Sequence, residues 1–121
     1  MVQLAALLGF LAVALGAFGA HGLKAVLSPY ARDIYQTAVE YQFYHAGALL
    51  LVAILQFRFE LKLLRWSAWA LLLGTLVFSG SLYILAVTGI SWLGAITPIG
   101  GAALLAGWLL LAVAASRMKA D

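Results

Sequence analysis

The sequence of 121 residues contains no cysteine and no asparagine. Without cysteine, the chain cannot be a thiol–disulfide enzyme, hold a metal through thiolates or carry a lipid on cysteine. Without asparagine, it has no N-glycosylation site. These two absences remove thiol chemistry and N-glycosylation from the functions to be considered.

Charged residues are also scarce, at 9% of the chain, whereas 66% is apolar and the mean hydropathy is +1.09. A soluble domain is typically about half apolar and about a quarter charged. A chain this short cannot bury so much apolar surface in one core. These values exclude a soluble globular domain, a disordered chain and a free nucleic-acid-binding domain. They predict an integral membrane protein whose partner is membrane lipid, with no nucleic-acid partner.

Four apolar runs of about 18–22 residues follow one another, each long enough as a helix to cross the hydrocarbon layer. Both prolines, Pro29 and Pro98, stand where a helix is expected to begin. The first run lacks a basic residue before it and is longer than a signal-peptide core, so we expect a retained helix. The sequence predicts an all-α, polytopic membrane protein with a single domain, 1–121. This domain is a four-transmembrane-helix bundle with helices at about 2–20, 29–57, 66–87 and 98–116.

Basic side chains are distributed unevenly over the two ends of such a bundle. Four crossings place both termini and the second connection on the same side. That side collects Arg58, Lys62, Arg65, Arg117 and Lys119. The opposite side has only Lys24 and Arg32. The positive-inside rule therefore predicts both termini in the cytoplasm, the alternative being that the two cations near the first helix reverse the orientation.

Small residues recur at helical spacing and predict close helix contacts, because helices in lipid associate through close backbone approach. The expected contact residues are Gly16, Gly74, Gly100, Gly101 and Gly107. The favoured interpretation is packing within one four-helix bundle. The alternative is a seam between the chains of a homo-oligomer.

Unusual polar groups gather in the half of the membrane opposite the termini. Measured from the hydrocarbon boundary on that side, Glu40 lies about 3 Å deep, Ser81 about 9 Å and His45 about 10 Å. Glu40, Tyr41 and His45 share one half of the second helix, which we expect to point toward the other helices because it is too polar for lipid. The candidate cluster comprises His21, Glu40, Tyr41, His45, Ser79, Ser81, Tyr83 and Thr97. Ionisable groups inside a membrane indicate a functional site by default.

Most members of this cluster also have a structural interpretation. Glu40 is close enough to the interface to pair with Lys24 or Arg32, and His21 is placed to cap the first helix. The serines can bond carbonyls of their own helix.

His45 is expected to be neutral and to need a hydrogen-bond partner, because a buried imidazole without one is costly. The candidate partners are Ser81, Tyr83 and the Gly16–Gly22 segment.

The polar groups do not match a known catalytic or metal-binding pattern. A dinuclear metal site is disfavoured by the single intramembrane carboxylate. Haem ligation is disfavoured because the two histidines differ in depth by roughly 10 Å. Ser81, His45 and Glu40 could form a hydrolase triad, but no nucleophile elbow accompanies them. We therefore assign no metal, no cofactor and no catalytic residue.

Four phrases of the sequence, in order, resemble a known family. They are GAFGAHGL at 16–23, TAVEYQFYHA at 37–46, FSGSLY at 78–83 and LGAITPIGG at 93–101. The resemblance covers essentially the whole chain and is to the small bacterial inner-membrane proteins called domain of unknown function 423, whose eukaryotic relatives are called transmembrane protein 256. It implies a four-helix protein of a bacterial inner membrane and no catalytic residue.

Three functions are compatible with these observations. The leading hypothesis is a non-enzymatic inner-membrane protein whose polar cluster fixes the bundle and binds an unidentified small molecule. One alternative is a small transporter or channel subunit acting as a homo-oligomer, which rests on Glu40 and His45. The other is a lipid-acting membrane enzyme. A water-filled cavity reaching Glu40 would favour transport, and a bond between Ser81 and His45 in a lipid-shaped groove would favour the enzyme. A fully bonded cluster would favour the structural role.

Overall fold

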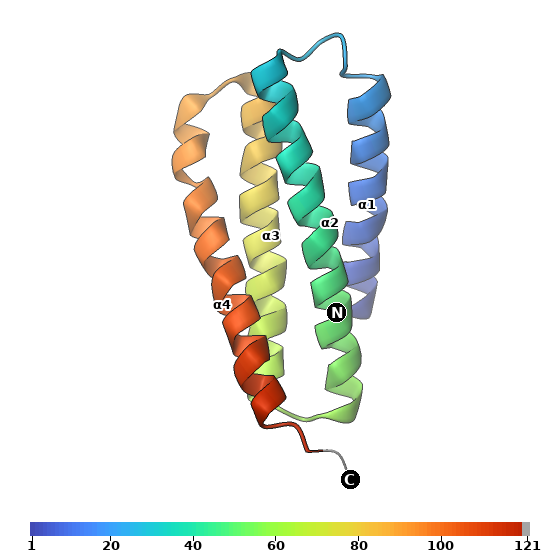
Figure 1. Cartoon of the computed structure of the whole chain (residues 1–121), viewed down its shortest axis with the longest axis vertical. Coiled ribbons are helices and arrows are strands. Elements are labelled where there is room, and N and C mark those ends of the chain that lie inside the picture. The colour runs from blue at the N-terminus through green and yellow to red at the C-terminus, as the bar shows by residue number, and fades with distance from the viewer. Residues whose placement is uncertain (120–121) are drawn as a thin grey trace.

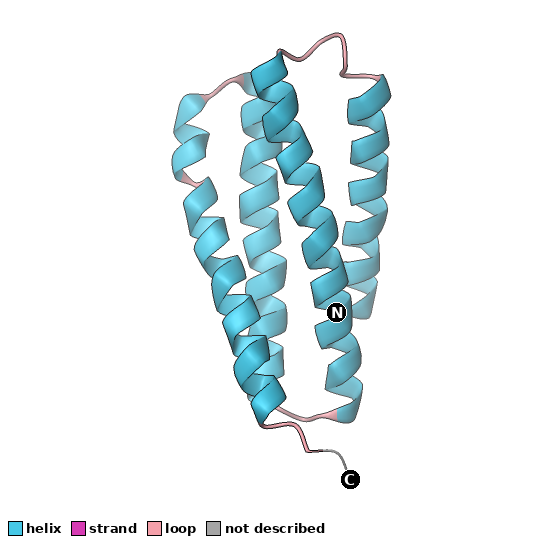
Figure 2. Cartoon of the chain, viewed as in Figure 1, coloured by secondary structure: helices cyan, strands magenta, loops and turns pink. Residues whose placement is uncertain are grey.

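The computed structural model describes residues 1–119, and within that range it consists of helices and connections without a β-strand (Figures 1 and 2). The elements are α1 (Val2–His21), α2 (Pro29–Arg58), α3 (Lys62–Thr88), the 3-10 helix η1 (Ser91–Ala95) and α4 (Thr97–Ser116). In this range four helical segments are long and apolar enough to cross a membrane. The predicted all-α, four-span architecture is confirmed. Residues 120 and 121 of the predicted domain lie outside the described residues.

Local chemistry explains where these helices begin and end. Ser28 caps α2, because its Oγ accepts from the Ala31 amide at 3.1 Å, and Pro29 occupies the first helical position. α3 ends at Gly89, whose φ of 72° is left-handed and favours glycine.

The third helix begins four residues before the predicted boundary at 66. Lys62 and Arg65 are exposed, whereas Leu64 is fully buried in the core. This first turn is therefore amphipathic, and its leucine holds it in the helix although its basic residues lie outside the apolar run. The connection between α2 and α3 shrinks to residues 59–61.

The helices lie side by side, with α2 and α3 in the middle and α1 and α4 on the two flanks (Figure 1). Each helix packs mainly on its neighbour in the sequence. We call the end with connections 22–28 and 89–96 the loop end, and the end with both termini and connection 59–61 the terminus end. The core centres on Leu49, Val52, Leu64 and Leu71, which are almost completely buried.

Glycines allow the close approach of α3 and α4. A Cβ at Gly74 would lie 2.9 Å from the Leu104 amide nitrogen, and one at Gly107 would lie 2.7 Å from Leu71 Cδ2. At Gly100 it would collide with the Phe78 backbone, 2.8 Å from its Cα. Three of the predicted contact glycines therefore face another helix of the same chain at distances where a side chain would force neighbouring atoms to move.

The other two predicted contact glycines differ in how tightly they pack. A Cβ at Gly16 would lie 3.1 Å from Val39 Cγ1 on α2, a tight contact between α1 and α2. A Cβ at Gly101 would lie 3.7 Å from Phe78, which is an ordinary contact distance. Gly101 is therefore the one of the five where a methyl group would fit without displacing its neighbours.

Candidate functional site

The polar residues of α2 do not all face the other helices: Glu40 is exposed, whereas His45 is buried. Glu40 is exposed, and its Oε1 accepts from Nε2 of Gln36, one turn earlier on the same helix, at 3.1 Å. The expectation that Glu40 points toward the other helices is therefore wrong. Its position near the interface permits this, because a carboxylate there can reach headgroups and water.

His21 also lies apart from the other predicted residues. It is the last residue of α1 and is exposed. The Phe18 carbonyl at this helix end accepts from the amides of Gly22 and Leu23 at 2.7 and 3.2 Å, so these backbone groups cap it. The structure does not bring His21 to the other members of the cluster.

His45 is buried, and both of its ring nitrogens are hydrogen-bonded. Trp108 Nε1 on α4 lies 3.0 Å from His45 Nε2, and His45 Nδ1 lies 2.7 Å from the Tyr41 carbonyl. The indole N–H can only donate, so Nε2 accepts and Nδ1 carries the proton. The two bonds are compatible with the tautomer that carries its proton on Nδ1.

The expected partners of His45 were wrong, because the partner on another helix is Trp108 rather than Ser81, Tyr83 or the Gly16–Gly22 segment. A sequence signal for Trp108 existed. It lies ten residues after Pro98, about 15 Å along α4, far from the interface where tryptophan is usually enriched. An indole N–H at that depth needs an acceptor.

Ser79 and Ser81 of α3 form hydrogen bonds to the two neighbouring helices, α2 and α4. Ser79 Oγ donates to the Ala38 carbonyl of α2 at 2.8 Å. Ser81 Oγ lies 2.6 Å from Thr97 Oγ1, at the start of α4, and 2.9 Å from the Phe78 carbonyl. Ser79, Ser81 and Thr97 therefore form contacts between helices at the loop end.

A second polar group, which sequence reasoning missed, centres on Gln42. This side chain is 4% exposed, and its Nε2 donates to the Leu8 carbonyl of α1 at 2.9 Å. Tyr83 on α3 donates its hydroxyl to Gln42 Oε1 at 2.6 Å. The Tyr83 ring packs edge-on against Tyr35, whose hydroxyl donates to the Leu15 carbonyl at 2.5 Å. These bonds connect α1, α2 and α3.

The bonding of these groups limits their chemistry. Across residues 1–119, every buried side-chain nitrogen or oxygen has a hydrogen-bond partner. The hydrolase triad drawn from the sequence is not assembled, because Ser81 bonds Thr97 and His45 bonds Trp108. The part of the chain that the structure describes also contains no group of three His, Cys, Asp or Glu residues that could hold a metal ion.

A lateral groove of about 670 Å³ lies between α2 and α4, with Phe78 of α3 among its lining residues. Its lining comprises Tyr41, Tyr44, His45, Phe78, Pro98, Gly101, Ala102, Leu104, Leu105 and Trp108. The Tyr41 ring stacks on Phe78, with 4.6 Å between centroids. The groove is therefore mostly apolar and aromatic.

The groove exists because α2 and α4 both pack on α3 rather than closely on each other. Its α4 residues run from Pro98 to Trp108, about 15 Å along the helix. α4 has 20 residues and therefore just spans the hydrocarbon layer of about 30 Å. The groove thus extends from the loop-end boundary to about the middle of the membrane.

The comparisons with known proteins agree with this architecture. Residues 15–101 match the family model described as "Protein of unknown function (DUF423)". No solved structure matches the chain.

Relatives cover almost the whole chain. The UPF0382 membrane protein SH2409 of Staphylococcus haemolyticus is 46% identical over 93% of this chain and 91% of its own length. YwdK, a UPF0382 membrane protein of Bacillus subtilis, is 45% identical over 94% of both chains. The UPF0382 inner membrane protein YgdD of Escherichia coli strain K12 is 44% identical over 98% of this chain and 91% of its own length. With its four apolar spans and these matches, the chain belongs to the DUF423 family of membrane proteins.

Proposed function

We propose that the protein binds a hydrocarbon chain of a membrane lipid in the groove between α2 and α4. The observation that carries this proposal is the groove itself, which is lined by aromatic and aliphatic side chains within the membrane-spanning part of the chain. Its length of about 15 Å matches half of the hydrocarbon layer, the depth that one lipid chain occupies.

The polar groups of the groove support an apolar occupant with its polar end toward the boundary. His45, the deepest polar side chain contributed by α2, has both nitrogens occupied, so it offers nothing to a polar ligand. Tyr41 and Tyr44 lie nearer the loop end, and their hydroxyls have no hydrogen-bond partner among residues 1–119. These phenols can donate to an ester carbonyl of a bound lipid.

Photo-crosslinking in bilayers tests this function. A phosphatidylethanolamine that carries a diazirine in one acyl chain is expected to label Tyr44, Leu105 and Trp108 more than Phe10, although Phe10 is 69% exposed at similar depth on α1. Ala102→Phe, which fills the groove, is expected to reduce groove labelling to the level of Phe10. Mass spectrometry of peptides reads out the adducts.

The matched control is Ala106→Phe, which places the same side chain on an exposed position of α4 outside the groove. It is expected to leave the labelling unchanged. Equal labelling of Phe10 and the groove residues, unaffected by Ala102→Phe, would show that lipid contacts the surface without a preferred site.

For orientation, we propose that both termini lie in the cytoplasm. The terminus end has five basic residues against two at the loop end, and short connections obey the positive-inside rule. The terminus-end residues are Arg58, Lys62, Arg65, Arg117 and Lys119. The groove then opens into the outer leaflet.

A pair of C-terminal fusions tests the orientation. A green fluorescent protein fusion is expected to fluoresce, because that reporter folds in the cytoplasm, and an alkaline phosphatase fusion is expected to be inactive. The opposite pair of results would place the groove in the cytoplasmic leaflet and refute the orientation, while leaving the lipid-chain proposal to its own test.

The two alternative functions have weaker support. Transport rested on Glu40 and His45 as intramembrane ionisable groups, but Glu40 is exposed and His45 is fully bonded. A lipid-acting enzyme rested on a bond between Ser81 and His45, and each of these side chains bonds another residue. Assembly into a homo-oligomer stays a prediction.

A further inference from the structure

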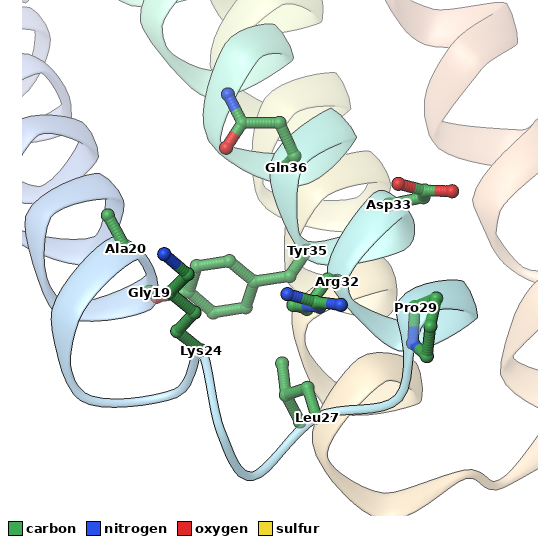
Figure 3. A pocket seen from close by; sticks show the side chains of 9 residues that line it. All are labelled: Gly19, Ala20, Lys24, Leu27, Pro29, Arg32, Asp33, Tyr35 and Gln36. Atoms are coloured by element: carbon green, nitrogen blue, oxygen red, sulfur yellow. The ribbon is translucent and has the colours of Figure 1, made fainter.

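A second pocket, of about 410 Å³, lies at the loop end between the end of α1, the 22–28 connection and the start of α2 (Figure 3). Its lining comprises Gly19, Ala20, Lys24, Leu27, Pro29, Arg32, Asp33, Tyr35 and Gln36. It is distinct from the lipid-chain groove and shares no residue with it.

Two cations converge on this pocket. Lys24 from the connection and Arg32 from α2 both line it, on either side of the Tyr35 ring in Figure 3. Neither side chain forms an ion pair or hydrogen bond with another residue of the described range. Asp33 is the one carboxylate of the lining. In this view Arg32 lies between it and Lys24. An anion between the two cations would relieve their mutual repulsion.

The Tyr35 ring in this pocket is fixed in place. Tyr35 is buried, and its hydroxyl is held by the Leu15 carbonyl. Its ring lies so close to Gly19 that a Cβ there would come within 2.9 Å of Cδ1. The edge-on contact with Tyr83 holds the ring from the side of α3. The two cations therefore flank a rigid aromatic side chain.

The level of the pocket indicates which anion can reach it. The apolar run of α2 begins at about residue 38, so Gln36 precedes it by about half a turn and Arg32 by almost two turns, and Ala20 is the penultimate residue of α1. This is the level of the lipid headgroups. A guanidinium beside an ammonium suits a phosphate, because the guanidinium can bond two of its oxygens and the ammonium adds a point charge.

We propose that the Lys24–Arg32 pocket binds the phosphate group of an anionic lipid headgroup. The side chains of Lys24 and Arg32 contact the phosphate oxygens, and the Tyr35 ring contacts the glycerol side of the headgroup. This site is independent of the lipid-chain groove, because a different pair of helices forms it.

Thermal unfolding of the purified protein in mixed micelles tests this site. Phosphatidylglycerol is expected to raise the Tm by about 5 °C more than the same mole fraction of phosphatidylcholine, because only the first brings a net anionic headgroup. Lys24→Gln/Arg32→Gln is expected to abolish this difference while leaving the Tm in phosphatidylcholine unchanged, since both side chains are exposed.

The matched control removes the same charge elsewhere. Arg117→Gln/Lys119→Gln, at the terminus end, is expected to keep the full phosphatidylglycerol effect. Ala102→Phe is also expected to keep it, which separates this site from the groove. Persistence of the effect in Lys24→Gln/Arg32→Gln would refute the site. An equal rise with millimolar inorganic phosphate in phosphatidylcholine micelles would refute the lipid headgroup as the source of the phosphate.

Discussion

Gly100→Leu is expected to destabilise the protein by about 3 kcal/mol, the upper end of the usual cost of overpacking. A Cβ at this position would collide with the Phe78 backbone, 2.8 Å from Cα, and backbone atoms cannot move aside as the end of a flexible side chain can. α4 must therefore separate from α3, which also breaks the bond between Ser67 and the Gly107 carbonyl. Unfolding in sodium dodecyl sulfate, followed by circular dichroism, measures the loss.

Gly47→Leu is the matched control for this substitution. Gly47 is exposed on α2, and a Cβ there would have no neighbour within 4 Å. The same change of residue should then alter stability little, since leucine at this position meets lipid. If Gly100→Leu and Gly47→Leu unfold at the same detergent fraction, Gly100 does not lie in close contact with the Phe78 backbone of α3.

Gln42→Met is expected to cost about 1–2 kcal/mol, because it leaves the hydroxyl of the half-buried Tyr83 without its acceptor. Methionine keeps the unbranched shape of glutamine and removes both of its polar atoms. The bond from Gln42 Nε2 to the Leu8 carbonyl, at 2.9 Å, is lost as well, so α1 is expected to detach most readily. The same detergent unfolding measures the effect.

A double-mutant cycle with Tyr83→Phe isolates the side-chain bond. Tyr83→Phe alone leaves Gln42 Oε1 unsatisfied, whereas the double variant leaves neither group unpaired. We therefore expect it to be less destabilised than the sum of the single variants, with a coupling of about 1 kcal/mol. Additive losses would mean that the 2.6 Å contact contributes no net stability.

Gln42 and Glu40 show how far helical periodicity predicts orientation. The two residues are two positions apart on α2 and therefore point in nearly opposite directions. The sequence ranks Glu40 higher, because a carboxylate in an apolar span is conspicuous. Burial favours Gln42, because a neutral amide loses less on leaving water and can both donate to Leu8 and accept from Tyr83.

The contact between His45 and Trp108 could not be found from either helix alone. Both residues lie away from the interface, but depth alone does not pair them, because Trp108 meets His45 only where α2 and α4, each packed on α3, face each other across the groove. That arrangement depends on which faces of α3 the two helices occupy. Ser79 bonds the Ala38 carbonyl of α2, and Ser81 bonds Thr97 at the start of α4, so each helix meets its own face of α3.

The amino-acid sequence alone determined the class, the number of spans and their approximate limits. Apolar runs must be as long as the hydrocarbon layer is thick, and Pro29 and Gly89 act on the backbone locally. The tertiary structure alone decided which polar groups are buried, which residue bonds His45, and that a groove remains between α2 and α4. These features depend on how each helix is rotated about its axis and on which helices it packs against. Many small contacts, such as those of Gly74 and Gly107, set both, because lipid does not favour one apolar face of a helix over another.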